Sequence, residues 1–347
     1  MKSYFDMRSQ NAIARQRQII HELPEFVKDY FVGIEQTTSP LTRLNYAYDL
    51  RLFLDYLVNM LDLFKGKKVK ELVVTDLNLV RAKHIEHFLS YVSSYVDEEN
   101  NSIKNGEHSK ARKLSSIKSM FRYFYNRDFI NENVTSKVEM PKLHEKPIVR
   151  LETDEVVKLL ENVEDGANLT ERERAYHKYT KKRDVAILTL LLGTGIRVSE
   201  CVGLNYEDVD FEVDGIKITR KGGNQEIVYF GDEVRVALID YIRERLAKIS
   251  VKIEPALFLS MQDKRLGVRA IQLLVKKYAS QTTPLKKITP HKLRSTYGTS
   301  LYKETNDIYI VADVLGHKDV NTTRKHYAAV SDDMRRSVAN KVKLRDN

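Results

Sequence analysis

The second half of the sequence carries an ordered series of cationic and hydrogen-bonding side chains that ends in a tyrosine. Arginine, lysine and histidine can hold an anion, and a tyrosine hydroxyl can act as a nucleophile. In chain order the series is Arg197, Lys221, His291, Arg294, His317 and Tyr327. His291 and Arg294 are three residues apart, so they share one face of a helix that Thr289 and Pro290 can begin. A histidine and an arginine at a helix N-terminus suit an anion.

Each member of the series also has an ordinary structural interpretation. A helical His-x-x-Arg is commonly a surface pair. Leu315-Gly316 predicts a helix that ends at the glycine, and His317, just beyond it, can cap that helix. A tyrosine on a helix usually packs, and the chain has 19 tyrosines. Only the order of the whole series singles out Tyr327.

That order resembles the catalytic domain of the tyrosine site-specific recombinases, and the bacterial Xer recombinases are the closest group. The motifs read Gly-Thr-Gly-Ile-Arg197-Val-Ser-Glu200, a Lys221 hairpin, His291-x-x-Arg294, Leu-Gly-His317 and, ten residues later, Tyr327. Each motif is moderately specific, whereas six in the right order are strongly specific. The N-terminal helices resemble the core-binding domain of this family more loosely.

The resemblance implies roles in the cleavage of a DNA phosphodiester. Arg197 and Arg294 would hold the non-bridging oxygens of a pentavalent, highly anionic transition state. Lys221 would protonate the leaving 5′ oxygen. Tyr327 would form a 3′-phosphotyrosine link, which stores the bond energy so that no ATP is needed.

The remaining residues would support these steps. His291 would help to deprotonate the tyrosine or share the hydrogen bonds of the phosphate, and His317 would donate a hydrogen bond to it. Glu200, one helical turn after Arg197, would orient an arginine or His291. The cations are all side chains and the sequence has no zinc-type or two-metal ligand cluster, so we expect no metal and no cofactor.

Two departures from the family pattern concern the subfamily. Ser295 stands where the family often has a second histidine, a position that varies. The spacing from His317 to Tyr327 is one residue longer than in the common Xer pattern and resembles that of many phage and transposon integrases. No other tyrosine follows His317, so Tyr327 is the candidate nucleophile there.

Periodicity predicts the elements that position this series. Residues 184–192 are a strongly apolar helix that Gly193 and Gly195 can end, and a short helix follows over 197–204. Alternating residues on both sides of a Lys-Gly-Gly-Asn turn predict a β-hairpin within 209–230. Further helices are expected near 232–249 and 266–280.

The first half of the sequence reads as helical. A helix begins at Ser39-Pro40, another contains Ile85 and Phe88, and residues 97–110 read as a polar loop. A third helix contains Leu114 and Phe121, and basic residues interleave with its apolar positions. These are a solvated face or, as the basic balance favours, DNA contacts: Lys110, Arg112, Lys113, Lys118 and Arg122.

Composition supports a DNA partner. The formal net charge of the 347 residues is +10, which suits a polyanion or an acidic membrane surface. The sequence shows no membrane span and no signal peptide, and the single cysteine, Cys201, excludes an internal disulfide, so a cytoplasmic, nucleoid-associated protein is expected.

Periodicity predicts a mainly α protein with a small β-sheet. The resemblance implies an N-terminal helical, SAM-like core-binding domain and a tyrosine-recombinase catalytic domain. The expected parts are an N-terminal extension (1–35), the core-binding domain (36–140), a proline-bounded linker (141–150), and the catalytic domain with a C-terminal tail (151–347).

The function implied by the resemblance is site-specific recombination through a Holliday junction by a homo-tetramer on two DNA sites, with Xer-like chromosome dimer resolution as the favoured role. An accessory DNA translocase or directionality factor is a further candidate partner. The alternatives are recombination for a transposon or phage, and relaxation of supercoils in the manner of a type IB topoisomerase. A decayed, non-catalytic DNA-binding protein is disfavoured, because binding alone needs no nucleophile.

Overall fold

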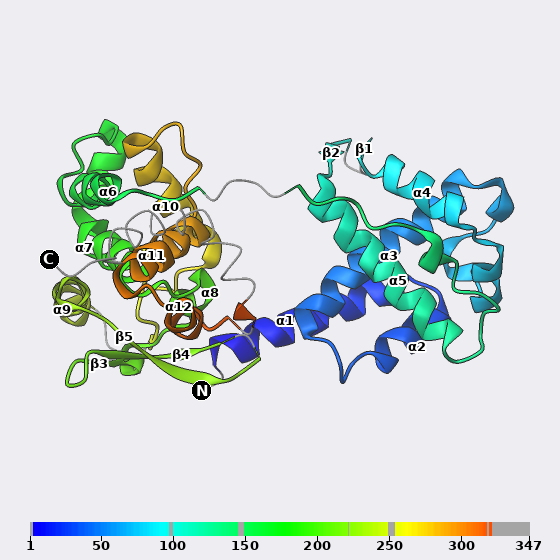
Figure 1. Cartoon of the computed structure of the whole chain (residues 1–347), viewed down its shortest axis with the longest axis horizontal. Coiled ribbons are helices and arrows are strands. Elements are labelled where there is room, and N and C mark those ends of the chain that lie inside the picture. Colours follow the sequence, from blue (N-terminus) through cyan, green and yellow to red (C-terminus); the bar gives the residue numbers. More distant parts are fainter. Residues whose placement is uncertain are drawn as a thin grey trace, which may run out of the picture. The chain divides into compact units, whose positions relative to one another are not determined.

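The chain divides into two units, Met1–Lys146 and Pro147–Asn347, in its computed structural model (Figure 1). The structure describes residues 3–96, 100–144, 149–220, 222–248, 254–317 and 319–320. Residues 145–148 of the predicted linker, Lys221, and the C-terminal tail with Tyr327 lie outside the described residues.

The N-terminal unit is built from amphipathic helices. They are α1 (Tyr4–His21), α2 (Glu25–Gly33), α3 (Pro40–Met60), α4 (Ala82–Tyr91) and α5 (Glu107–Tyr125), with 3-10 turns at Asp62–Phe64, Val69–Glu71, Val74–Leu79 and Val134–Lys137. The predicted start of α3 is confirmed: the Ser39 hydroxyl accepts a hydrogen bond from the Thr42 N–H, and Pro40 occupies the first turn.

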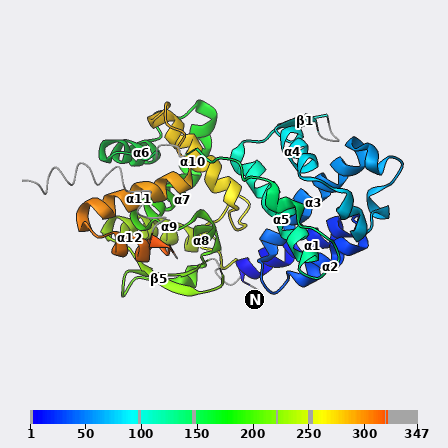
Figure 2. The same ribbon diagram turned by 45° about the vertical axis from the view of Figure 1, so that its right-hand side comes forward.

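One apolar core joins these helices. Phe53 of α3, Phe88 of α4 and Phe121 of α5 are fully buried, and the Phe53 ring lies edge-on to both others. The predicted N-terminal extension contributes to the same core, because Ile19 of α1 and Tyr30 of α2 are buried in it. α3 and α5 lie side by side in both views (Figures 1 and 2).

The prediction of an uninterrupted polar loop over 97–110 is wrong. Strands β1 (Ser94–Val96) and β2 (Ser102–Lys104) pair antiparallel, and α5 already begins at Glu107. The strands are three residues each and expose most of their side chains, so they lack the apolar alternation by which a sequence predicts a strand.

In the C-terminal unit, α7 (Glu171–Thr194) is the central helix and packs against α6 (Thr153–Asp165), α9 (Asp232–Lys248) and α11 (Pro290–Thr305). Its second half is buried on nearly all sides, as expected for a helix that is apolar all round. The predicted apolar helix over 184–192 is the second half of α7, which begins at Glu171 because Thr170 and Glu173 form a capping box.

The remaining elements of this unit frame the candidate site. They are α8 (Val198–Gly203), the 3-10 turn Tyr206–Asp208, strands β3 (Val209–Asp210), β4 (Gly215–Thr219) and β5 (Gln225–Tyr229), α10 (Val268–Thr282) and α12 (Ile308–Leu315). The strands form an antiparallel sheet in the order β3-β4-β5, which confirms the predicted hairpin. The sheet lies beside α12 in both views (Figures 1 and 2). The mainly α fold with a small sheet is thereby confirmed.

Candidate active site

Arg197 and Glu200 are fixed to each other at the start of α8. Gly195 ends α7 in the left-handed conformation at φ 62°, and Arg197 becomes the N-cap of the next helix. The Glu200 carboxylate accepts the Arg197 backbone N–H at 2.7 Å and its guanidinium at 2.9 Å. Glu200 is 2 % exposed, whereas a third of the Arg197 side chain reaches solvent. Glu200 thus holds an arginine that keeps donors for a ligand.

Arg294 projects from the second turn of α11 into the interior of the same unit. One of its terminal nitrogens donates to the Gly195 carbonyl at 2.5 Å, and the other donates to the Leu315 carbonyl. Arg294 is 4 % exposed. Its guanidinium therefore ties the end of α7 to the end of α12.

The end of α12 brings the two arginines together. Gly316 follows α12 in the left-handed conformation at φ 60°, as the Leu-Gly-His motif predicted. Arg197 donates to the Gly316 carbonyl at 3.2 Å, next to the Leu315 carbonyl that Arg294 uses. His317 follows directly, and its backbone N–H donates to the Ala312 carbonyl at 2.9 Å. Three members of the predicted series thus meet at one helix end.

His291 lies one turn before Arg294 on α11 and is exposed. Thr289 and Pro290 begin this helix as predicted. Its first turn combines the positive end of the helix dipole with His291, and such a helix end favours an anion.

Arg220, the residue before Lys221, also contacts the end of α12, which the sequence alone did not indicate. Its buried guanidinium donates to the carbonyl oxygens of Val314 at 2.9 Å and Leu315 at 3.4 Å. It also pairs with Glu200 at 3.4 Å and Glu226 at 2.6 Å. An arginine at the tip of a hairpin is unremarkable in sequence, and only the position of α12 reveals these partners.

Gly316 is required for this arrangement. A Cβ on Gly316 would lie 2.8 Å from both Cζ and Nε of Arg220, and its positive φ is costly for any other residue. We expect Gly316→Ala to lower the free energy of unfolding by about 1–3 kcal/mol, measured by urea denaturation. At Gly231 a Cβ would meet open space, so Gly231→Ala is the control. An equal loss in both variants would contradict the packing of Arg220 on Gly316.

The five basic residues predicted to contact DNA have different surroundings along α5. Arg122 is exposed. Lys113 is buried and pairs with the buried carboxylate of Asp49 at 3.4 Å, and Arg112 pairs with the same carboxylate. Lys110 pairs with Glu107, and Lys118 donates to the Val138 carbonyl at 2.6 Å. A role in binding DNA stays a prediction for all five, and the exposed Arg122 fits it best.

Two nearby titratable groups are kept neutral. Burial raises the pKa of the Cys201 thiol, which is a small core residue of α8. Burial also raises the pKa of Tyr297, whose ring lies against Gly195. Neither group is prepared to act as a nucleophile.

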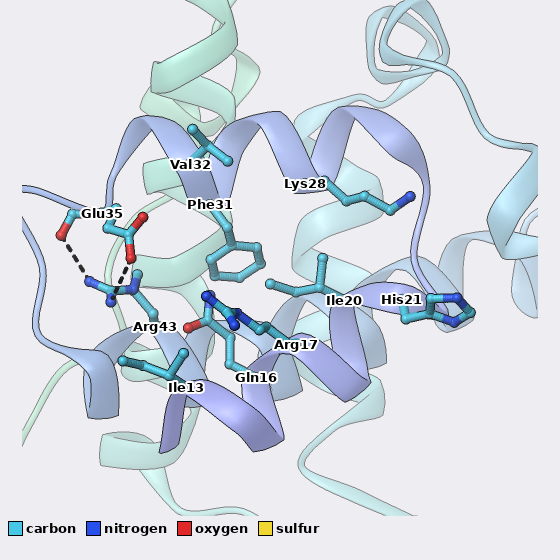
Figure 3. A pocket seen from close by; sticks show the side chains of 10 residues that line it. All are labelled: Ile13, Gln16, Arg17, Ile20, His21, Lys28, Phe31, Val32, Glu35 and Arg43. Carbon is cyan, nitrogen blue, oxygen red and sulfur yellow. Dashed lines mark hydrogen bonds and ion pairs between the residues drawn. The ribbon is translucent and has the colours of Figure 1, made fainter. Parts of the chain in front are cut away.

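A separate pocket of about 440 Å³ lies in the N-terminal unit between α1, α2 and α3 (Figure 3). Apolar side chains such as Ile13, Ile20 and Phe31 line it together with Arg17 and Lys28.

Within the described ranges, no three histidine, cysteine or acidic side chains group closely enough to hold a metal ion. No helix of the described part is long and apolar enough to cross a membrane.

Residues 149–334 match the model of the phage integrase family. The chain belongs to the phage integrase family. This match contains every member of the candidate series, from Arg197 to Tyr327.

A curated relative covers nearly the whole length of this phage integrase family member. The chain is 33 % identical over 329 residues to the tyrosine recombinase XerC of Caldanaerobacter subterraneus subsp. tengcongensis, covering 92 % of this chain and 86 % of the relative. The resemblance to Xer recombinases is therefore confirmed.

Solved structures share the fold of this integrase family member. The XerH recombinase bound to its difH substrate has a TM-score of 0.59 at 20 % identity, covering 83 % of this chain and 76 % of that one. A lambda integrase tetramer bound to a Holliday junction has a TM-score of 0.60 at 15 % identity, covering 87 % and 76 %. The two-domain fold expected from the sequence is the fold of these recombinases.

Proposed function

We propose that this protein is a site-specific DNA recombinase that cleaves and rejoins DNA through a 3′-phosphotyrosine intermediate. The observation that carries the proposal is the meeting of Arg197 and Arg294 at the end of α12, directly before His317. Two guanidinium groups and a histidine at one point suit a single phosphate better than an extended stretch of DNA backbone. Family membership and the XerC relative support the same reaction.

The reaction follows from the chemistry of these side chains. The Tyr327 oxygen attacks the phosphorus, and the bond from phosphorus to the 5′ oxygen breaks. The tyrosine proton passes to a base for which His291 is the candidate, and Lys221 gives a proton to the leaving oxygen. Arg197, Arg294 and His317 offset the negative charge of the transition state.

Rejoining reverses these steps. A 5′ hydroxyl attacks the phosphotyrosine and restores the free tyrosine. Because the phosphotyrosine keeps the energy of the broken bond, the proposed reaction uses no ATP. The positive charge at the phosphate comes from arginine, lysine and histidine side chains, so the proposed reaction uses no metal ion.

The proposed partner is double-stranded DNA carrying a recombination site, with four copies of the chain acting on two sites. The net charge of +10 supports DNA binding. The fold shared with XerH on its substrate and with the lambda integrase tetramer supports this assembly. Xer-like resolution of chromosome dimers at the nucleoid is the proposed role, with an accessory DNA translocase or directionality factor as a further candidate partner.

Recombination for a mobile element is the second candidate. The longer spacing from His317 to Tyr327 favours it, because many phage and transposon integrases share that spacing. The two roles use the same cleavage chemistry and differ in the DNA sites that they join.

The reaction is tested with a plasmid that carries two copies of the chromosomal or element-borne site. We expect the plasmid to be resolved into two circles without added ATP and in the presence of a chelator. Relaxation of supercoils without resolution would identify topoisomerase activity instead. Binding without a covalent adduct on a nicked substrate would contradict the catalytic proposal.

Arg122 and Lys113 give a further prediction about α5. We expect Arg122→Ala to weaken DNA binding and to reduce the slope of log affinity against log salt by about 1, because one phosphate contact is lost. Lys113→Ala should leave that slope unchanged and lower the free energy of unfolding by about 1–3 kcal/mol, because Asp49 loses a buried partner. Fluorescence anisotropy across a salt series and urea denaturation give both numbers.

The opposite pattern would remove this assignment. If Lys113→Ala unfolds like the wild type and lowers the salt slope as much as Arg122→Ala, then Lys113 leaves its buried pair to bind DNA.

A further inference from the structure

Arg220 connects the lysine hairpin to the helix end where the other candidate residues meet. We propose that Arg220 is a positioning residue that anchors the start of the glycine turn containing Lys221 to the end of α12. In this proposal the Arg220 side chain links the turn that carries the leaving-group acid to the helix end at which the phosphate-binding residues meet. The inference rests on the proposed function and adds to it a residue with no chemical step of its own.

The side chain of Arg220 is held from both sides. Towards α12 it donates to the Val314 carbonyl at 2.9 Å and the Leu315 carbonyl at 3.4 Å. Towards β5 it forms a bidentate ion pair with the Glu226 carboxylate, whose oxygens lie 2.6 Å from Nε and 3.3 Å from a terminal nitrogen. The side chain is only 8 % exposed, so these bonds are shielded from water and hold one geometry.

The same guanidinium is part of the arginine cluster. Leu315 accepts hydrogen bonds from both Arg220 and Arg294. Glu200 accepts from both Arg220 and Arg197. Arg197 and Arg294 also have hydrogen bonds that do not involve Arg220, to the Gly316 and Gly195 carbonyl oxygens, so they should keep their positions when Arg220 is changed.

The backbone of Arg220 closes the turn that contains Lys221. Its N–H donates to the Asn224 carbonyl at 2.8 Å, and its carbonyl accepts the Gly223 N–H at 3.0 Å. Gly222 and Gly223 have φ values of 107° and 91°, which glycine adopts readily. Since Lys221 follows Arg220 in the chain, the anchored Arg220 side chain limits how far the start of this glycine turn can move.

This anchor has a specific chemical consequence. A general acid must lie within hydrogen-bond reach of the leaving oxygen, and a misplacement of about 1 Å can cost about 100-fold in rate. Because Arg220 acts through Lys221, loss of the Arg220 side chain should slow cleavage only where the leaving group needs a proton. A 5′ sulfur in place of the bridging oxygen leaves as a thiolate and needs no such proton.

The test compares cleavage of two nicked DNA substrates, one ordinary and one with a bridging 5′ sulfur, by wild type and Arg220→Gln. We expect Arg220→Gln to form covalent adduct about 10- to 100-fold more slowly on the ordinary substrate and within about threefold of wild type on the sulfur substrate. DNA affinity should stay unchanged. Unchanged cleavage of the ordinary DNA, or an equal loss on both substrates, would overturn the proposal.

Two further variants control for effects on the sheet and on folding. Arg235→Gln is the matched control, because Arg235 donates to the Phe211 carbonyl at 2.6 Å and pairs with Asp214 at the other end of the same sheet. It should cleave both substrates like the wild type. If Arg220→Gln melts below the assay temperature, Arg220→Lys replaces it, because a lysine keeps the charge but cannot bridge Glu226 and α12 in the same geometry. Failure of the wild type itself to form adduct contradicts the proposed function, not only the role of Arg220.

Discussion

Tyr327→Phe should abolish covalent adduct and recombination, with a loss of at least about 1,000-fold in cleavage rate. The substitution removes one hydroxyl oxygen and leaves the ring, so neither folding nor DNA affinity should change. Adduct formation should be lost because no other tyrosine follows His317 in the chain. Adduct on a denaturing gel, anisotropy with labelled DNA and a thermal melt measure the three quantities.

Tyr309→Phe is the matched control for this substitution. Tyr309 lies on α12 and is 70 % exposed, so its hydroxyl can be lost without harm to the core. We expect Tyr309→Phe to cleave like the wild type. Adduct formed by Tyr327→Phe at the wild-type rate would place the nucleophile elsewhere.

Arg294→Ala should reduce cleavage by about 100- to 1,000-fold, which is typical for the loss of one donor to a transition-state oxyanion. It should also lower the free energy of unfolding by about 1–3 kcal/mol, because the carbonyl oxygens of Gly195 and Leu315 lose a buried donor. DNA affinity should change by less than about tenfold, since most contacts to the DNA backbone remain. Single-turnover kinetics and urea denaturation separate the two effects.

Arg294→Lys distinguishes chemistry from folding. Lysine keeps the charge but lacks the planar fork that reaches two acceptors, so most of the rate loss should remain at higher stability. Wild-type cleavage by the lysine variant would show that Arg294 acts as a point charge, and wild-type cleavage by the alanine variant would remove it from the site.

Much of this site follows from the order of motifs along the chain. The Leu-Gly-His pattern predicts that α12 ends at Gly316, and the structure confirms it. The sequence also predicts the position of Arg197 after a glycine-ended helix. These features are local, because a left-handed glycine or a helix cap depends on a few neighbouring residues.

What the sequence could not predict depends on residues far apart in the chain. Lys113 looked like part of a basic face, but its partner Asp49 is 64 residues away on α3. Arg220 has its α12 partners 94 and 95 residues away, so periodicity gives no hint of them. Glu200 was expected to orient an arginine, and it contacts two, Arg197 and Arg220.

The most direct test of the central claim is to find the amino acid that carries the DNA after cleavage. The covalent adduct from a nicked substrate is digested with trypsin and nuclease, and the peptide that retains a nucleotide is sequenced by mass spectrometry. We predict a nucleotide on Tyr327 within the peptide of residues 326–335, joined through the 3′ phosphate. A nucleotide on any other residue, or one joined through a 5′ phosphate, would contradict the claim.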